Sequence, residues 1–309
     1  MKQDEVRESF FKRMFAKGER EESRKVLTFV LCMALVLAEC LMSLGIGGEK
    51  RENQAEAADD TVTIKGYSAR GDGKWDLIEF GHYVQKADAG ATPEPIQWRV
   101  LLANATEAVL LSDKILDYRK MADSDTEAAS ALGQDWSGLG IWRWLNSAES
   151  GFLANALDEE ERKAVVEPAS YSLVVGDTKS PVFLLDSGGS FQATYGLDYD
   201  TPAHKIAKNT EYAAKQAVDL SAVESGGWML RDQALSSDVN NAGRYISADG
   251  ELKTMALTAV AGVRPCLHID LTKEDVWKYA GTVDSAGNIV TPTPTSTPTA
   301  TPTGTPTVS

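Results

Sequence analysis

Two short segments near the C-terminal end of the chain carry the residue types best suited to binding a ligand. Trp228 and Arg231 lie three positions apart in one segment, and Arg264 lies in the other, Gly262-Val263-Arg264-Pro265. An indole face suits a sugar ring, and the fixed fork of a guanidinium suits a carboxylate or phosphate. Convergence of these three side chains would therefore form a binding face for cell-surface carbohydrate or peptide.

A structural role for the same residues is the alternative, and we favour it. Trp228 would then be a core residue, and Arg231 and Arg264 would hold buried carboxylates or carbonyls, because a buried Arg without such a partner is costly. Trp142 is a further candidate for ligand contact. It lies two positions before Trp144 in a predicted helix, so the two rings point to different faces. We expect Trp144 in the core and Trp142 exposed.

An oxygen-rich loop follows the first segment and is the candidate metal site. It contains Asp232, Asp238 and Asn240, whose side-chain oxygens are ligands that calcium accepts. The spacing does not match a full calcium-binding loop, and such residues are common in turns for backbone reasons alone. We therefore expect no cofactor, with calcium at this loop as the alternative.

No arrangement of residues in the sequence indicates catalysis. Cys266 is the one Cys outside the apolar N-terminal head, and we expect a buried hydrophobe rather than a nucleophile. The three His are far apart, without the spacing of metal ligands. A Gly-rich phosphate loop, a nucleophile elbow and a metalloprotease motif are all missing. We therefore predict no catalytic residues.

The elements that must position the candidate residues lie within residues 61–281, where we expect one globular α+β domain. Apolar and alternating runs predict short strands, at 77–81, 96–101, 108–112, 181–185, 228–231, 243–246 and 262–271. The second and third of these strands, joined by a short turn, predict a hairpin. Helices are expected over 141–146, over 159–166 with Asp158 as N-cap, and at 210–216.

The two ends of the chain differ from the globular part in composition. Residues 1–25 are predicted to be a cytoplasmic n-region, and 26–46 is an apolar run of membrane length. That run is either a transmembrane signal anchor or the core of a signal peptide cleaved near Ala57. A polar spacer at 47–60 and a disordered Thr/Pro-rich tail at 282–309 complete the chain. The domain is therefore expected outside the cell, held at the membrane or secreted.

Charge excludes one class of partner. The chain has 45 acidic and 31 basic residues, a net charge of −14 at pH 7. A strongly acidic domain repels the phosphate backbone, so we expect no nucleic-acid partner.

A series of motifs, in a fixed order, resembles an uncharacterised domain family common in surface proteins of Gram-positive bacteria. The motifs are Phe80-Gly81-His82-Tyr83, Pro95-Ile96-Gln97-Trp98-Arg99-Val100-Leu101, Trp144-Leu145-Asn146, Val182-Phe183-Leu184-Leu185, Tyr212-Ala213, Trp228-Met229-Leu230-Arg231 and Gly262-Val263-Arg264-Pro265. Each motif is weak alone, and their order makes a chance match improbable. The family is remotely similar to the formylglycine-generating, sulfatase-modifying fold, and this implies a C-type-lectin-like architecture.

The resemblance does not extend to the chemistry of the sulfatase-modifying enzymes. Those enzymes need a pair of reactive Cys to hold copper, and only Cys266 is available here. We therefore predict an exported or surface-anchored, non-catalytic ligand-binding or display module. The alternatives are a metal- or oxygen-dependent modifying enzyme on the related fold and a purely structural surface spacer.

Overall fold

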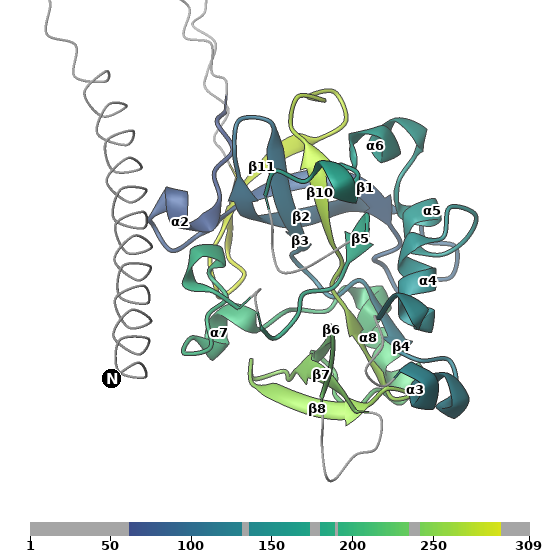
Figure 1. Cartoon of the computed structure of the whole chain (residues 1–309). Coiled ribbons are helices and arrows are strands. Elements are labelled where there is room, and N and C mark those ends of the chain that lie inside the picture. The colour runs from purple at the N-terminus through teal and green to yellow at the C-terminus, as the bar shows by residue number, and fades with distance from the viewer. Residues whose placement is uncertain (1–61, 132–135, 174–179, 189–190, 235–241, 292–309) are drawn as a thin grey trace, which may run out of the picture. The chain divides into compact units, whose positions relative to one another are not determined.

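The computed structural model describes residues 62–131, 136–173, 180–188, 191–234 and 242–291 (Figure 1). The chain divides into two compact units, Met1–Asp60 and Thr61–Ser309. The first unit lies outside the described residues, and so do the n-region, the polar spacer and most of the Thr/Pro tail that the sequence predicted. The second unit is a single mixed α+β domain, as predicted, with two sheets and a few short helices.

The prediction of a transmembrane helix has to be corrected. No helix in the described part of the chain combines the length and the apolar character that crossing a membrane requires. The longest of these helices, α8 (Glu211–Asp219), has 9 residues, whereas a span needs about 20. The apolar run 26–46, on which the prediction rested, lies outside the described residues.

The larger sheet forms the first layer of the domain. Its strand order is β12-β11-β1-β2-β3-β10-β5, and all of its paired neighbours are antiparallel. The strands are β1 (Trp75–Tyr83), β2 (Glu94–Ala103), β3 (Glu107–Ser112), β5 (Val182–Phe183), β10 (Cys266–Asp270), β11 (Lys278–Val283) and β12 (Ile289–Val290). The predicted hairpin is confirmed as β2 and β3, in which Val100 lies opposite Leu110.

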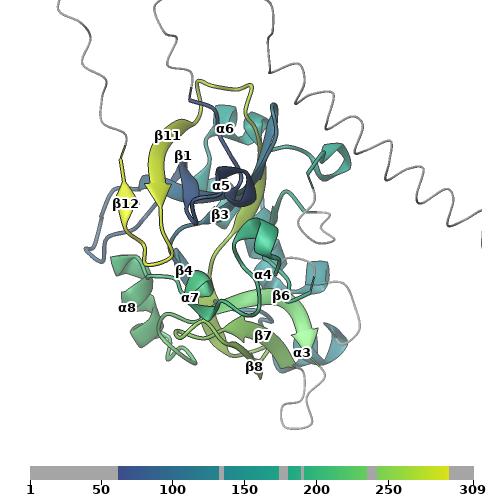
Figure 2. The same cartoon turned by 90° about the vertical axis from the view of Figure 1, so that its left-hand side faces the viewer.

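The smaller sheet has the order β4-β9-β6-β7-β8, and β6, β7 and β8 lie together below the larger sheet in both views (Figure 2). Its strands are β4 (Asp117–Lys120), β6 (Trp228–Ala234), β7 (Ala242–Ile246), β8 (Leu252–Ala256) and β9 (Val260–Val263). β6 and β9 pair in parallel, with Trp228 opposite Gly262, so the two segments that carry the candidate residues are neighbours. Two short links, 113–116 and 264–265, connect the two sheets.

Short helices flank the sheets, and α4, α5 and α6 follow one another along one side of the domain (Figure 1). The helices are α2 (Tyr67–Arg70), α3 (Asp125–Ala131), α4 (Gly140–Asn146), α5 (Phe152–Ala156), α6 (Glu159–Ala164), α7 (Pro202–Lys205) and α8. The predicted N-cap of α6 is confirmed. The Asp158 carboxylate accepts from the Glu161 backbone N–H, while the Glu161 carboxylate accepts from that of Asp158, which makes a capping box.

Three fully buried Trp side chains anchor the core. Trp75, Trp98 and Trp228 are each 0% exposed. Each indole N–H donates to a backbone carbonyl: Trp75 to Tyr195 at 2.9 Å, Trp98 to Phe80 at 2.7 Å and Trp228 to Lys205 at 2.9 Å. A buried indole N–H needs such an acceptor. Each of these hydrogen bonds therefore satisfies the N–H group and also fixes the position of the ring.

Several elements differ from the sequence prediction. β4, β8, β11 and β12 were not predicted. β11 and β12 carry the regular structure to Val290, whereas we expected the domain to end at Gly281.

Candidate functional site

The structure brings Trp228 and Arg264 together, but in the core. Arg264 is 1% exposed, and its guanidinium lies 4.8 Å from the centre of the Trp228 ring. Nε and Nη2 of Arg264 donate to the Ser112 carbonyl at 3.0 and 2.8 Å, and Nη2 also donates to that of Asp113 at 3.3 Å. Arg264 therefore ties the two links between the sheets to each other.

Arg231 is also buried, with 7% of its surface exposed. Its Nη1 donates to the Leu184 carbonyl at 3.3 Å, and Nη2 is paired with the Asp186 carboxylate. Trp228, Arg231 and Arg264 thus have the arrangement that we favoured, in which the ring is core and both Arg hold carbonyls or a carboxylate. The three side chains do not form an open face, because all three are buried.

The two Trp of α4 need a correction as well. Trp142 and Trp144 are both half-buried, whereas we expected Trp144 in the core and Trp142 exposed. The Trp142 indole N–H donates to the Ser180 hydroxyl at 2.6 Å. The Trp144 ring is covered by the Arg119 guanidinium, 4.3 Å from the ring centre. Ligand contact by Trp142 stays a prediction.

The predicted calcium loop is only partly described. Asp232 accepts from the Ser187 backbone N–H at 2.8 Å and from its hydroxyl at 2.5 Å, and it lies 3.3 Å from Nε of Arg244. Asp238 and Asn240 lie outside the described residues. Within the described ranges, no three His, Cys, Asp or Glu side chains come together in a way that could hold a metal ion.

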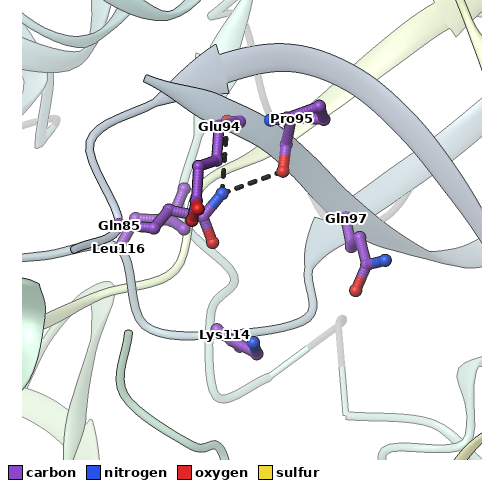
Figure 3. Close-up of a pocket in the computed structure, with 6 residues that line it drawn as sticks. All are labelled: Gln85, Glu94, Pro95, Gln97, Lys114 and Leu116. Carbon is purple, nitrogen blue, oxygen red and sulfur yellow. Dashed lines mark hydrogen bonds between the residues drawn. The ribbon is translucent and has the colours of Figure 1, made fainter. Parts of the chain in front are cut away.

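A pocket of about 200 Å³ lies elsewhere, between the start of β2 and the link from β3 to β4, and it is our candidate functional site (Figure 3). It is lined by Gln85, Glu94, Pro95, Gln97, Lys114 and Leu116. Four of these six side chains are polar. One carries a negative charge and one a positive charge, and two are amides, so the pocket offers hydrogen-bond donors and acceptors at close quarters.

Hydrogen bonds to backbone carbonyl groups fix the walls of this pocket. The Gln85 side chain donates to the carbonyls of Glu94 and Pro95 at 3.2 and 2.8 Å, which ties the end of β1 to the start of β2 (Figure 3). On the opposite wall, the Asp113 N–H donates to the Gln97 carbonyl at 2.9 Å, and the Ile115 N–H donates to that of Lys208 at 2.9 Å. Lys114 is therefore held between two anchored residues.

A buried ion pair supports the same wall. Nε of Arg99 lies 2.7 Å from Oδ1 of Asp113, and the two side chains are 3% and 7% exposed. Asp113 immediately precedes Lys114, so this pair fixes the link from which the Lys114 side chain projects. Rigid elements beneath a pocket reduce the ordering cost of binding.

The polar side chains of the pocket are available. Glu94, Gln97 and Lys114 are half-buried, and their side chains make no hydrogen bond or ion pair in the described chain. Half-buried polar groups are usually satisfied by protein partners or water. Three such groups around one small cavity are what a site for a polar ligand requires.

Sequence reasoning missed this pocket because its residues come from separate segments without a shared motif. Gln85 follows β1, Glu94 to Gln97 open β2, and Lys114 and Leu116 lie between β3 and β4. One signal was present in the sequence. Gln97 interrupts an otherwise apolar stretch that was correctly predicted to be a strand, and Lys114 follows two residues after the end of another.

The fold and the pocket together define a mixed α+β domain of two sheets with a small polar cavity at one end of a β-hairpin. The chain belongs to the family described as "Domain of unknown function (DUF6273)", whose model matches residues 106–271. No curated protein and no solved structure matches the chain. The resemblance to an uncharacterised domain family is thus confirmed at this level. Lys114 and Leu116 lie inside the matched region, whereas the other four pocket residues precede it.

Proposed function

We propose that this domain is a non-catalytic ligand-binding module and that the pocket of Figure 3 binds a peptide. The observation that carries the proposal is the set of half-buried, unpaired polar side chains, Glu94, Gln97 and Lys114, around one cavity in the described part of the chain. Water can satisfy these side chains in the free protein, and a polar ligand that displaces the water can take over the same hydrogen bonds.

The chemistry of the pocket favours peptide over carbohydrate. The Gln97 amide has a donor and an acceptor that match both halves of a peptide group, the Lys114 ammonium suits a carboxylate or carbonyl, and Glu94 suits an ammonium. None of the six lining residues has an aromatic ring on which a sugar could stack. The volume of about 200 Å³ falls below the ~300 Å³ of sites for drug-sized ligands, so it fits one residue or one chain end.

The test is a binding screen with the whole protein and short peptides that differ in terminal charge, followed by NMR shift mapping. We expect chemical shifts to change around the pocket, and Lys114→Met to weaken binding at least tenfold. Lys120→Met is the matched control because Lys120 is exposed on β4 and outside the pocket. Equal binding by the Lys114→Met protein would reject the proposal. A complete lack of binding would favour the structural-spacer alternative.

A separate measurement tests the alternative that the protein is a modifying enzyme. Metal analysis of the same purified protein would support a modifying enzyme if copper or iron were present in stoichiometric amount. Cys266 is a poor candidate for such chemistry, since burial raises the pKa of its thiol and it is fully buried.

We also propose the finer assignments that the sequence resemblance implied, a C-type-lectin-like fold and a place among surface domains of Gram-positive bacteria. Contact between the last two motifs of the resemblance supports the fold assignment, because Trp228 and Gly262 are neighbours across β6 and β9 and Arg264 lies over the Trp228 ring. An experimental structure superposed on sulfatase-modifying enzymes is the test. A different strand order around Trp228 would count against the assignment.

A further inference from the structure

A second pocket, of about 190 Å³, lies where β1, α6 and the segment before β11 meet. Six of its lining residues have charged, titratable or indole side chains that could contact a ligand: Trp277, His82, Glu79, Glu161, Asp275 and Lys278. Pro95 lines this pocket as well as the one in Figure 3, so the two adjoin at the start of β2. Their chemistry differs, because only the second pocket has an aromatic ring and an excess of one charge.

Trp277 is the distinctive residue of this pocket. Three of the other six indoles, those of Trp75, Trp144 and Trp228, have an Arg guanidinium over the ring, at 4.6, 4.3 and 4.8 Å from its centre, whereas the other three have none among the described residues. Half-buried Trp277 has no cation and no aromatic ring against it in the described chain. Its N–H donates to the Leu271 carbonyl at 3.2 Å, which fixes the ring in place.

A buried carboxylate forms another part of the wall. Glu161 is 6% exposed, and its two oxygens accept from the backbone N–H groups of Gly81 at 3.2 Å and Asp158 at 2.8 Å. The His82 ring nitrogen Nδ1 lies 3.5 Å from Oε1. The position of this carboxylate is thus set by the backbone before any ligand arrives, and each oxygen retains a lone pair for a further donor.

Gly81 is the residue that allows this geometry. Its φ is +70°, and a Cβ atom there would lie 2.5 Å from Cδ2 of Leu157 and 2.8 Å from the Ala156 carbonyl oxygen. Only Gly combines this conformation with so close an approach. The contact brings β1 against the connection between α5 and α6, and it thereby places Glu161 beside His82.

The charge of the pocket selects the class of ligand. Glu79, Glu161 and Asp275 oppose a single ammonium, that of Lys278, which lies across from Glu79 in the β1–β11 pairing. A small cavity with a fixed indole and an excess of carboxylates attracts a cation and repels an anion. The ring suits an organic cation, since a positive charge with an apolar surface gains from contact with the indole face.

We infer that this second pocket binds an organic ammonium ion, with the cation against the Trp277 ring and near the Glu161 carboxylate. A methylated ammonium and a primary alkylammonium, such as the end of a Lys side chain, share this chemistry. The inference does not depend on peptide binding at the first pocket, because the two pockets share only Pro95 and no polar side chain.

Titration of the full-length protein with choline, n-butylammonium and the neutral choline isostere 3,3-dimethylbutan-1-ol is the first test, by calorimetry and NMR. We expect at least one of the two cations to bind tenfold more tightly than the neutral isostere, and added salt to weaken that binding. Preference for choline would indicate a methylated ligand, and preference for n-butylammonium a primary amine. Equal binding of the isostere, or no binding of either cation at millimolar concentration, overturns the inference.

Variants locate the binding. Trp277→Leu should reduce cation affinity at least tenfold, and Asp275→Asn should reduce it several-fold. Glu274→Gln removes the same charge from the exposed neighbour that does not line the pocket, and it should leave affinity unchanged. Glu161 is avoided because its replacement also disrupts the cap of α6. Lys114→Met, which tests the first pocket, should leave cation binding intact, so the two proposals fail separately.

Discussion

The His268 imidazole is hydrogen-bonded through Nδ1 to Oε1 of Glu107, between the neighbouring strands β10 and β3. His268 is 0% exposed, and the Tyr171 ring stacks on its imidazole with centroids 3.7 Å apart. Glu107 also accepts from the Ser172 backbone N–H at 2.8 Å. This buried pair therefore fastens the segment around Tyr171 to the larger sheet.

Acidification should destabilise the domain through this pair. Burial lowers the pKa of His268 below its usual 6.5, and the bond to Glu107 offsets this only in part. Burial raises the pKa of Glu107, but hydrogen bonds from Ser172 and His268 outweigh it and lower that pKa below 4.5. The unfolded chain therefore binds more protons than the folded one, first below about pH 6.5 and again below about pH 4.5. Stability should fall as pH falls through both ranges.

Urea unfolding between pH 7.5 and 5.0 measures the first of these ranges. The wild-type free energy of unfolding should decrease across it, whereas His268→Gln should be less stable at pH 7.5 and nearly independent of pH. His82→Gln is the control, because the His82 side chain is 54% exposed, and it should keep the wild-type pH profile. A wild-type profile in the His268→Gln protein would show that another group causes the dependence.

Replacement of Arg264 by Lys should not be conservative. The guanidinium contacts the carbonyls of Ser112 and Asp113 with two nitrogens while it lies over Trp228, and a single ammonium cannot reproduce that fork. Each lost charged hydrogen bond contributes about 1.5–3 kcal/mol, so Arg264→Lys should lower the free energy of unfolding by at least about 2 kcal/mol.

Arg119 is the matched control for Arg264. It also lies over an indole, that of Trp144, but its side chain is 40% exposed, whereas Arg264 is 1% exposed. Arg119→Lys should therefore change stability by less than about 1 kcal/mol. Equal losses for the two variants, measured by denaturant unfolding, would contradict the structural role assigned to Arg264.

Gly262 is required by the close contact of β6 and β9. A Cβ atom at this position would lie 2.6 Å from the Gly227 carbonyl oxygen and 2.8 Å from Cγ2 of Ile115. Gly262→Ala should cost about 1–3 kcal/mol, since the backbone pairing must open to admit the methyl group. Gly138→Ala meets nothing within 4 Å and should be neutral to within about 0.5 kcal/mol. Thermal and urea unfolding of both variants checks the difference.

The strands that sequence reasoning found are those in which apolar residues dominate. β3 is buried along its whole length and β2 is buried from Trp98 to Leu101, so both strands contain apolar runs that the sequence displays. β11 was missed, because its first half is exposed or half-exposed and only Gly281, Thr282 and Val283 are buried. Such a strand is stabilised mainly by pairing with its neighbours β1 and β12, and a single sequence does not reveal which strands will pair.

The functional residues were harder to predict, for a physical reason. Trp and Arg are the types that most often bind ligands, but the same side chains also hold a core together, as Trp228 does through the Lys205 carbonyl. Burial decides between the two roles, and burial depends on the packing of distant segments. Gln97 and Lys114 have ordinary types and spacing, and only the folded chain brings them to one cavity.

The pocket of Figure 3 should contain residues that are not optimal for stability. The half-buried Lys114 ammonium has no partner in the described chain, so Lys114→Met replaces an unpaired charge with an apolar side chain and should raise the free energy of unfolding, by up to about 1 kcal/mol. Arg99→Met should have the opposite effect on stability. It leaves Asp113 buried without its ion pair, so it should lower the free energy of unfolding by about 3–5 kcal/mol. Urea unfolding of the two proteins is the measurement. A clear loss of stability in Lys114→Met would mean that Lys114 supports the fold, and the argument for a ligand at this pocket would lose its main residue.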